Sequence, residues 1–139
     1  MTKDTPVISG SNKAVWAGRI ISTLPVLLMG GTGLMTLINP APMRPTFTAL
    51  GYSAHVVPVI AAVEVICAIL YAIPQTAVLG AILLTGYLGG ATASHVRVGQ
   101  PMFLLPVAVG VLVWLGLYLR DVRVRSLIPW RKVVAGSCP

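Results

Sequence analysis

The fold is decided by one continuous stretch, residues 55–96, which reads HVVPVIAAVEVICAILYAIPQTAVLGAILLTGYLGGATASHV. It contains two apolar runs, roughly 55–73 and 76–96, which meet at a break formed by Pro74 and Gln75. A bilayer core about 30 Å thick needs about 20 helical residues, and each run has about that length. Proline cannot continue a helix, so two spans fit better than one long helix. The stretch therefore predicts two membrane-spanning helices joined by a very short turn.

Two further apolar runs flank this stretch. One runs roughly over 16–38 and stops before Pro40, and the other runs roughly over 102–119 and meets charge at Arg120. Hydrophobic residues make up 56% of the 139 residues and charged residues 9%, against about 25% in ordinary soluble domains. A soluble chain this short has too little interior to hide so many apolar side chains. We expect an all-α integral membrane protein, a four-transmembrane-helix bundle in a single domain over residues 1–139.

Basic residues are distributed unevenly between the two sides that four spans define. Four spans put both termini and the second turn on one side, and that side holds eight of the ten Lys and Arg residues: Lys3, Lys13, Arg19, Arg120, Arg123, Arg125, Arg131 and Lys132. The other side holds Arg44 and Arg97. Cytoplasmic loops are enriched in Lys and Arg, so the N and C termini are predicted to be cytoplasmic. The net charge of +7 then serves contact with lipid head groups, and no nucleic-acid partner is expected.

Glu64 is the most informative residue, because it lies near the middle of the second apolar run. A carboxyl near the bilayer midplane is costly, and it usually faces the bundle interior or a water-filled cavity. The functional interpretation makes Glu64 a proton carrier, a general acid or base, or a cation site. The structural interpretation is a protonated carboxyl that bonds to a neighbouring helix. Tyr87 belongs to the next run at about the same depth, so a Tyr87–Glu64 hydrogen bond is a further prediction.

A second polar feature is expected at the outer end of the third run, where His95 and Arg97 follow Thr92. A histidine can change its protonation near neutral pH. With His55 at the start of the second run, these residues predict a small polar mouth, although Arg97 could equally be an interfacial anchor. Two histidines with no carboxylate nearby make a weak metal site, so no metal is expected.

The candidate site residues follow from these two features. The candidate catalytic residues are Glu64, His95 and Tyr87, and the candidate substrate-binding residues are Arg97, Thr92 and His55. Glycines near them have a packing interpretation, because Gly86 and Gly90 form a GxxxG pair that lets membrane helices approach closely. Cys67 and Cys138 form no CxxC motif and are not expected to pair.

The third run and its surroundings resemble the DoxX-like family of bacterial membrane proteins. The residues that carry the resemblance are AVLGAILLTGYLGGATASHVR at 77–97, VLVWLGLYLRD at 111–121 and the glutamate in the second span, Glu64. The resemblance implies a four-helix bundle in the bacterial cytoplasmic (inner) membrane. The wider DoxX grouping takes its name from a small subunit of a thiosulfate:quinone oxidoreductase. This sequence has no CxxC, haem-binding pair or flavin fingerprint, so no resident cofactor is evident and quinone is the candidate ligand.

Three functions stay open on the sequence. The first is a component of a membrane oxidoreductase that binds a quinone or similar lipid, with Glu64, Tyr87 and His95 bonding the head group or moving protons. The second is an isomerase or hydrolase that acts on a small hydrophobic molecule with Glu64 as its acid or base. The third is a small proton-coupled transporter. A homo-oligomer or a partner membrane subunit is compatible with each of them, and so is a purely structural role in assembly.

Overall fold

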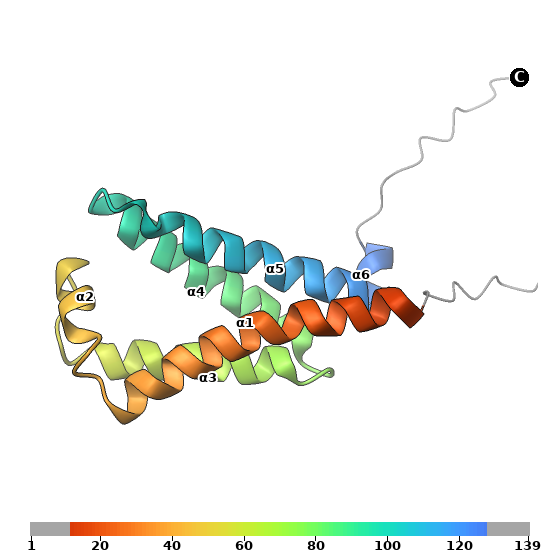
Figure 1. Cartoon of the computed structure of the whole chain (residues 1–139), viewed down its shortest axis with the longest axis horizontal. Coiled ribbons are helices and arrows are strands. Elements are labelled where there is room, and N and C mark those ends of the chain that lie inside the picture. Colours follow the sequence, from red (N-terminus) through yellow and green to blue (C-terminus); the bar gives the residue numbers. More distant parts are fainter. Residues whose placement is uncertain (1–11, 128–139) are drawn as a thin grey trace, which may run out of the picture.

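The computed structural model describes residues 12–127, and this part of the chain is helical without a strand (Figure 1). The helices are α1 Asn12–Ile38, α2 Arg44–Ala49, α3 Val57–Ala72, α4 Ala77–Arg97, the 3-10 helix η1 Pro101–Phe103, α5 Leu104–Arg120 and α6 Val122–Leu127. Several residues used in the predictions above lie outside the described range: Lys3, Arg131, Lys132 and Cys138.

The long helices match the predicted runs to within a few residues, because proline and glycine set the breaks between them. Pro40 follows α1, and Pro74 separates α3 from α4. Gly99 adopts a positive φ of 68° in the turn before Pro101. Three helical segments are long and apolar enough to cross a membrane, namely Lys13–Ile38, Ala77–Arg97 and Pro101–Arg120. The fourth apolar helix, α3, has only 16 residues and so a length of about 24 Å.

The four long helices form a ring. Helix α1 packs against α3 and α5, and α4 packs against the same two helices from the other side (Figure 1). Large apolar side chains point away from this ring along its length, for example Leu27 (73% exposed), Met35 (71%) and Val111 (61%). So many exposed apolar side chains on long apolar helices need a lipid surrounding. The chain is therefore a multi-pass membrane protein.

The tightest packing lies at the end of the bundle that carries the start of α1 and the end of α5, here called the terminal end. Tyr71 of α3 is fully buried there, with its hydroxyl 2.8 Å from the Val113 carbonyl and 3.0 Å from Ser22 Oγ. Arg120 donates to the Tyr71 carbonyl at 2.9 Å, and its guanidinium lies 4.7 Å from the centre of the Tyr71 ring. These contacts join α1, α3 and α5 at one point.

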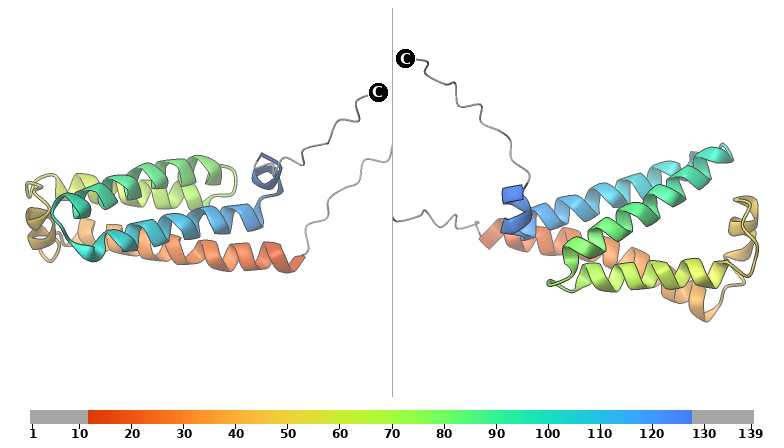
Figure 2. Two further views of the ribbon diagram at one scale, coloured as in Figure 1. Left: turned by 90° about the horizontal axis from the view of Figure 1, so that it is seen from above. Right: turned by 180° about the vertical axis from the view of Figure 1, so that it is seen from behind.

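The bundle opens toward its other end, here called the α2 end. Figure 2 shows α4 and α3 diverging from their shared turn toward α2. The surroundings of the glycines of α4 show this opening. A Cβ added at Gly80 would overlap the backbone of Tyr71, whereas a Cβ added at Gly86 or Gly90 would meet nothing within 4 Å. The expectation that Gly86 and Gly90 bring α4 close to another helix of this chain is therefore wrong. Close approach occurs about two to three turns earlier, at Gly80, and the later glycines leave open space.

Candidate ligand-binding site around Glu64

Glu64 lies two turns into α3, and its side chain is buried between α1 and α4. It is 8% exposed. Its Oε1 is 2.7 Å from Thr32 Oγ1 on α1, and its Oε2 accepts a hydrogen bond of 2.8 Å from the Tyr87 hydroxyl on α4. The predicted Tyr87–Glu64 hydrogen bond is thus confirmed. Both carboxyl oxygens have polar partners, which lowers the cost of placing a carboxyl among apolar helices.

Glycine on α1 makes this arrangement possible. A Cβ at Gly33 would lie 2.8 Å from the Val65 side chain, 3.2 Å from the Ala61 carbonyl and 3.4 Å from Glu64 Cγ. Because Gly33 has no side chain, α1 and α3 approach closely at this position. The adjoining residue, Thr32, then comes within hydrogen-bond reach of the carboxyl. Gly33 therefore allows α1 to pack against α3 and also lets the neighbouring Thr32 hydroxyl reach Glu64.

A cavity of about 380 Å³ opens on the Tyr87 side of this carboxyl, between α4, α3 and α2. This volume is within the range of about 300–1,000 Å³ typical of small-molecule sites. Gly86, Gly90 and Ala91 of α4 supply a part of the wall with little or no side chain, and Tyr87 lies among them. The residues that line the cavity are Thr46, Phe47, Leu50, Tyr52, Ile60, Gly86, Tyr87, Gly90, Ala91, Ser94 and His95.

The segment that contains α2 closes the cavity at the α2 end. Tyr52 and Phe47 form an edge-to-face ring pair with centroids 6.0 Å apart. The Tyr52 hydroxyl is 2.7 Å from Ser94 Oγ, and Ser94 donates its own proton to the Gly90 carbonyl at 2.8 Å. Tyr52 is therefore the donor to Ser94, since Ser94 has only one hydroxyl proton. This bond holds the α2 segment against α4.

The predicted site residues divide between the cavity and other places. Tyr87 and His95 both line the cavity, and His95 Nδ1 is 2.9 Å from Gln100 Oε1. Arg97 reaches back at its rim and donates to the carbonyl of Leu50 at 2.6 Å. His55 is exposed, is absent from the cavity lining and has Nε2 3.3 Å from Ser53 Oγ. The structure thus joins Glu64 to Tyr87 by a hydrogen bond and places Tyr87 and His95 in the lining of one cavity, while Arg97 contacts the lining residue Leu50.

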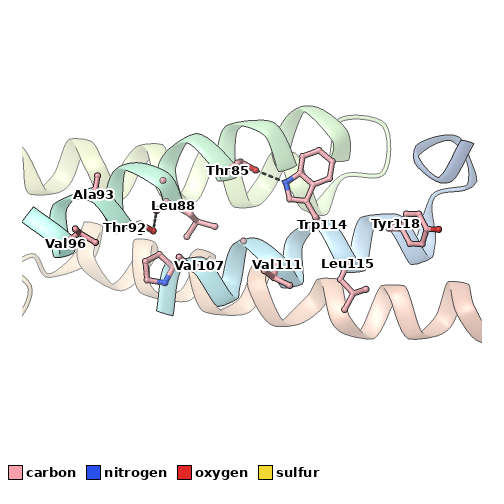
Figure 3. A pocket seen from close by; sticks show the side chains of 13 residues that line it. Thr85, Leu88, Thr92, Ala93, Val96, Val107, Val111, Trp114, Leu115 and Tyr118 are labelled. Carbon is pink, nitrogen blue, oxygen red and sulfur yellow. Dashed lines mark hydrogen bonds between the residues drawn. The ribbon is translucent and has the colours of Figure 1, made fainter. Parts of the chain in front are cut away.

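Thr92 faces a different hollow. It donates to the Leu88 carbonyl at 2.7 Å and lines a groove of about 880 Å³ between α4 and α5, shown in Figure 3. Trp114 crosses this groove and donates its indole N–H to Thr85 Oγ1 at 2.8 Å. The groove is the larger hollow, but Tyr118 is its one ionisable lining residue among those described, whereas the cavity is lined by Tyr52, His95 and Tyr87, the hydrogen-bond partner of Glu64. The cavity beside Tyr87 is therefore the better candidate site.

Among the residues of the site that were not predicted, three matter most for its shape and chemistry. Thr32 contacts the carboxyl directly, and Phe47 and Tyr52 form the cavity wall at the α2 end. Thr32 carried a signal, because it is a hydroxyl residue set among glycines at about the depth of Glu64. Phe47 lies on α2 and Tyr52 in the loop that follows it, and the position of this segment over the bundle depends on contacts that are distant in sequence, such as that of Tyr52 with Ser94.

Comparison with known families agrees with this architecture. The model of the DoxX-like family matches residues 20–116, a range that includes Glu64, Tyr87 and His95. The match covers more than half of the chain, and the protein belongs to the DoxX-like family. No curated protein and no solved structure matches it.

Proposed function

We propose that this protein binds a quinone, or a lipid-like molecule with a similar oxygen-bearing head group, as a component of a membrane oxidoreductase. The observation that carries the proposal is the Glu64 carboxyl, which is buried and is bonded to a tyrosine whose side chain also lines the cavity. Apolar walls with a few convergent polar groups are typical of sites for small hydrophobic ligands. Reduction of a quinone needs protons as well as electrons, and a membrane-embedded carboxyl is a common proton carrier.

The residues have separate roles in this proposal. The ring of the ligand lies along the wall of Gly86 and Gly90, where no side chain occupies the space. Tyr87 stands between the ligand and Glu64. When the ligand binds, the hydroxyl proton of Tyr87 turns from Glu64 Oε2 to an oxygen of the head group, and the carboxyl replaces that proton once the reduced head group has taken it up. His95 offers the ring nitrogen not committed to Gln100. The sequence has no flavin or haem motif, so a partner protein supplies the electrons.

The same proposal includes the topology. Four helices of one bundle cross the bacterial inner membrane, and the described chain ends lie together at the terminal end (Figure 1). Lys13, Arg19, Arg120, Arg123 and Arg125 belong to that end, and Arg44 and Arg97 to the other. The excess of positive charge assigns the terminal end to the cytoplasm. The short helix α3 spans the membrane together with the turn residues on either side, which add to its length.

Binding of a short-chain benzoquinone to the protein in lipid nanodiscs tests the function. We expect saturable binding by the wild type and about tenfold weaker binding by Tyr87→Phe, because one hydrogen bond to the head group, worth about 1.4 kcal/mol, is lost. The matched control is Tyr118→Phe, a tyrosine whose side chain lines the α4–α5 groove and not the cavity. Wild-type protein that does not bind, or equal binding by Tyr87→Phe, would contradict the proposal.

A further inference from the structure

The hydrogen bonds of Thr32 indicate whether Glu64 is protonated and which of its oxygens carries the proton. Thr32 Oγ1 lies 2.7 Å from the Leu28 carbonyl oxygen and 2.7 Å from Glu64 Oε1. A threonine hydroxyl has one proton, and a backbone carbonyl can only accept. If Glu64 were ionised, Thr32 would have to donate to two acceptors at once, and one of these short contacts would join two bare oxygens.

A protonated carboxyl removes the conflict. Glu64 then donates from Oε1 to Thr32 Oγ1, and Thr32 donates onward to the Leu28 carbonyl. Tyr87 donates to Oε2, which becomes the carbonyl oxygen of the acid. Each of the three short contacts then has one donor and one acceptor. The alternative site for the proton, on Oε2, would leave the two contacts of Thr32 in conflict as before.

Among residues 12–127, no Lys or Arg side chain bonds the Glu64 carboxyl, whose hydrogen-bond partners are Thr32 and Tyr87. On α4 the facing titratable group is Tyr87, with His95 two turns further along in the same cavity lining, and on α3 it is Cys67, one turn further along. The α1 segment from Leu28 to Thr36 has no ionisable side chain. Tyr52 is the titratable group that the α2 segment contributes to the same cavity.

A second hollow reaches Thr32 from the opposite side to the ligand cavity. This crevice, of about 420 Å³, is lined by Gly31, Thr32, Met35, Thr36, Asn39, Pro42 and Met43. Thr32 and Thr36 lie on one face of α1, and Asn39 directly follows the end of that helix; together they lead to the α2 end of the bundle. None of the residues that line the crevice also lines the ligand cavity. Glu64 therefore lies between two separate hollows, with Tyr87 on one side and Thr32 on the other.

We propose that Glu64 is protonated at rest and exchanges its proton with water at the α2 end through Thr32 and the crevice, while its ligand binds on the Tyr87 side. This deepens the proposed function, on which it rests for the role of Glu64 as a proton donor. In the exchange, the carboxyl proton moves to Thr32 Oγ1 as the hydroxyl proton of Thr32 leaves to a crevice water. One proton passes outward, no electron moves, and Thr32 ends with its new proton directed at the carboxylate. The reverse sequence reloads Glu64.

Infrared spectroscopy of the protein in nanodiscs, without any quinone, tests this route. The chain has three acidic side chains, so a protonated-carboxyl band that disappears in Glu64→Gln is assigned to Glu64. After transfer to D2O, this band shifts as the proton exchanges. We expect Thr32→Val to slow the exchange about tenfold, because the hydroxyl step is lost, and Thr32→Ser to exchange like the wild type.

Two further variants keep the test decisive. Thr23→Val removes a hydroxyl that donates to the Ile20 carbonyl at 2.6 Å near the terminal end of the same helix. In this variant the Glu64 proton should exchange at the wild-type rate. Thr36→Val, which makes the crevice less polar, should slow exchange even if Thr32→Val does not fold. Absence of the band at neutral pH, or wild-type exchange in both Thr32→Val and Thr36→Val, would overturn the proposal. Failure of quinone binding would instead overturn the proposed function and leave the exchange result standing.

Discussion

At the scale of single residues, Glu64 is held by two helices that do not pack against each other as a pair. Thr32 on α1 and Tyr87 on α4 each contact one of its carboxyl oxygens, with α3 between them. A buried carboxyl without partners would be strongly destabilising. The two contacts therefore stabilise the open half of the bundle, where side-chain packing is sparse.

The same contacts indicate a substitution, Glu64→Gln, that should remove the proton of Glu64 without disturbing the fold. A glutamine at position 64 can donate from its amide to Thr32 and accept from Tyr87, which reproduces the hydrogen bonds of a protonated carboxyl. Glu64→Gln should therefore fold like the wild type, while losing the proton that can be released. Its thermal unfolding in detergent is the measurement that separates loss of the proton from loss of the site.

Sequence alone was informative about Glu64 and Tyr87, because depth along a helix follows from counting residues. It was less informative about Thr32 and Ser94, whose importance depends on the rotation of α1 and α4 about their axes. Nearly uniform apolar composition hides that rotation, because a membrane helix has no polar face turned to water. The small residues Gly33 and Ala61, which fix how α1 meets α3, are visible in the sequence but have many alternative partners.

At the scale of elements, α4 has two halves with different tasks. Its first half packs on α3 at Gly80, and its second half leaves space at Gly86 and Gly90. The divergence of α3 and α4 from one tight turn produces the cavity in which Tyr87 and His95 lie (Figure 2). The helix ends were predictable from Pro40, Pro74 and Pro101. The short helix α2 was not, because contacts such as Tyr52–Ser94 and Arg97–Leu50, rather than an apolar periodicity, hold its segment.

Two alanine substitutions on α4 test this division. Gly80→Ala should lower the free energy of unfolding by about 1–3 kcal/mol, because the added methyl group overlaps the backbone of Tyr71. Gly86→Ala is the matched control, since it makes the same chemical change on the same helix with nothing within 4 Å. Thermal or denaturant unfolding in detergent measures both. Equal effects of the two substitutions would contradict the observed opening of the bundle.

At the scale of the whole molecule, the proposed topology makes a prediction about which residues face each side of the membrane. Four crossings would put both ends on one side, and eight of the ten Lys and Arg residues would lie on that side. We expect Arg44→Cys, in a chain with Cys67 and Cys138 replaced by alanine, to react with a membrane-impermeant maleimide added to intact cells. Lys13→Cys in the same background should react only after the cells are opened. The opposite pattern, or labelling of both in intact cells, would refute the proposed topology.

The two hollows that α4 lines differ in their relation to the buried carboxyl, because the cavity beside Tyr87 adjoins it and the groove between α4 and α5 does not. Gly90 lines the cavity beside Tyr87, and its neighbour Gly89 lines the larger groove between α4 and α5. Neither glycine has an atom within 4 Å of where a Cβ would lie, so a larger side chain at either position enters open space. This pair of adjacent residues therefore separates the two candidate sites with minimal change to the fold.

The most direct test of the central claim is quinone binding to Gly90→Leu and Gly89→Leu in nanodiscs. Leucine at position 90 occupies the cavity beside Tyr87, and we expect it to weaken binding of a short-chain benzoquinone at least about tenfold. Leucine at position 89 projects into the groove, and we expect wild-type affinity. Loss of binding in Gly89→Leu with retention in Gly90→Leu would contradict the account, since the ligand would then occupy the groove and not the cavity beside Glu64.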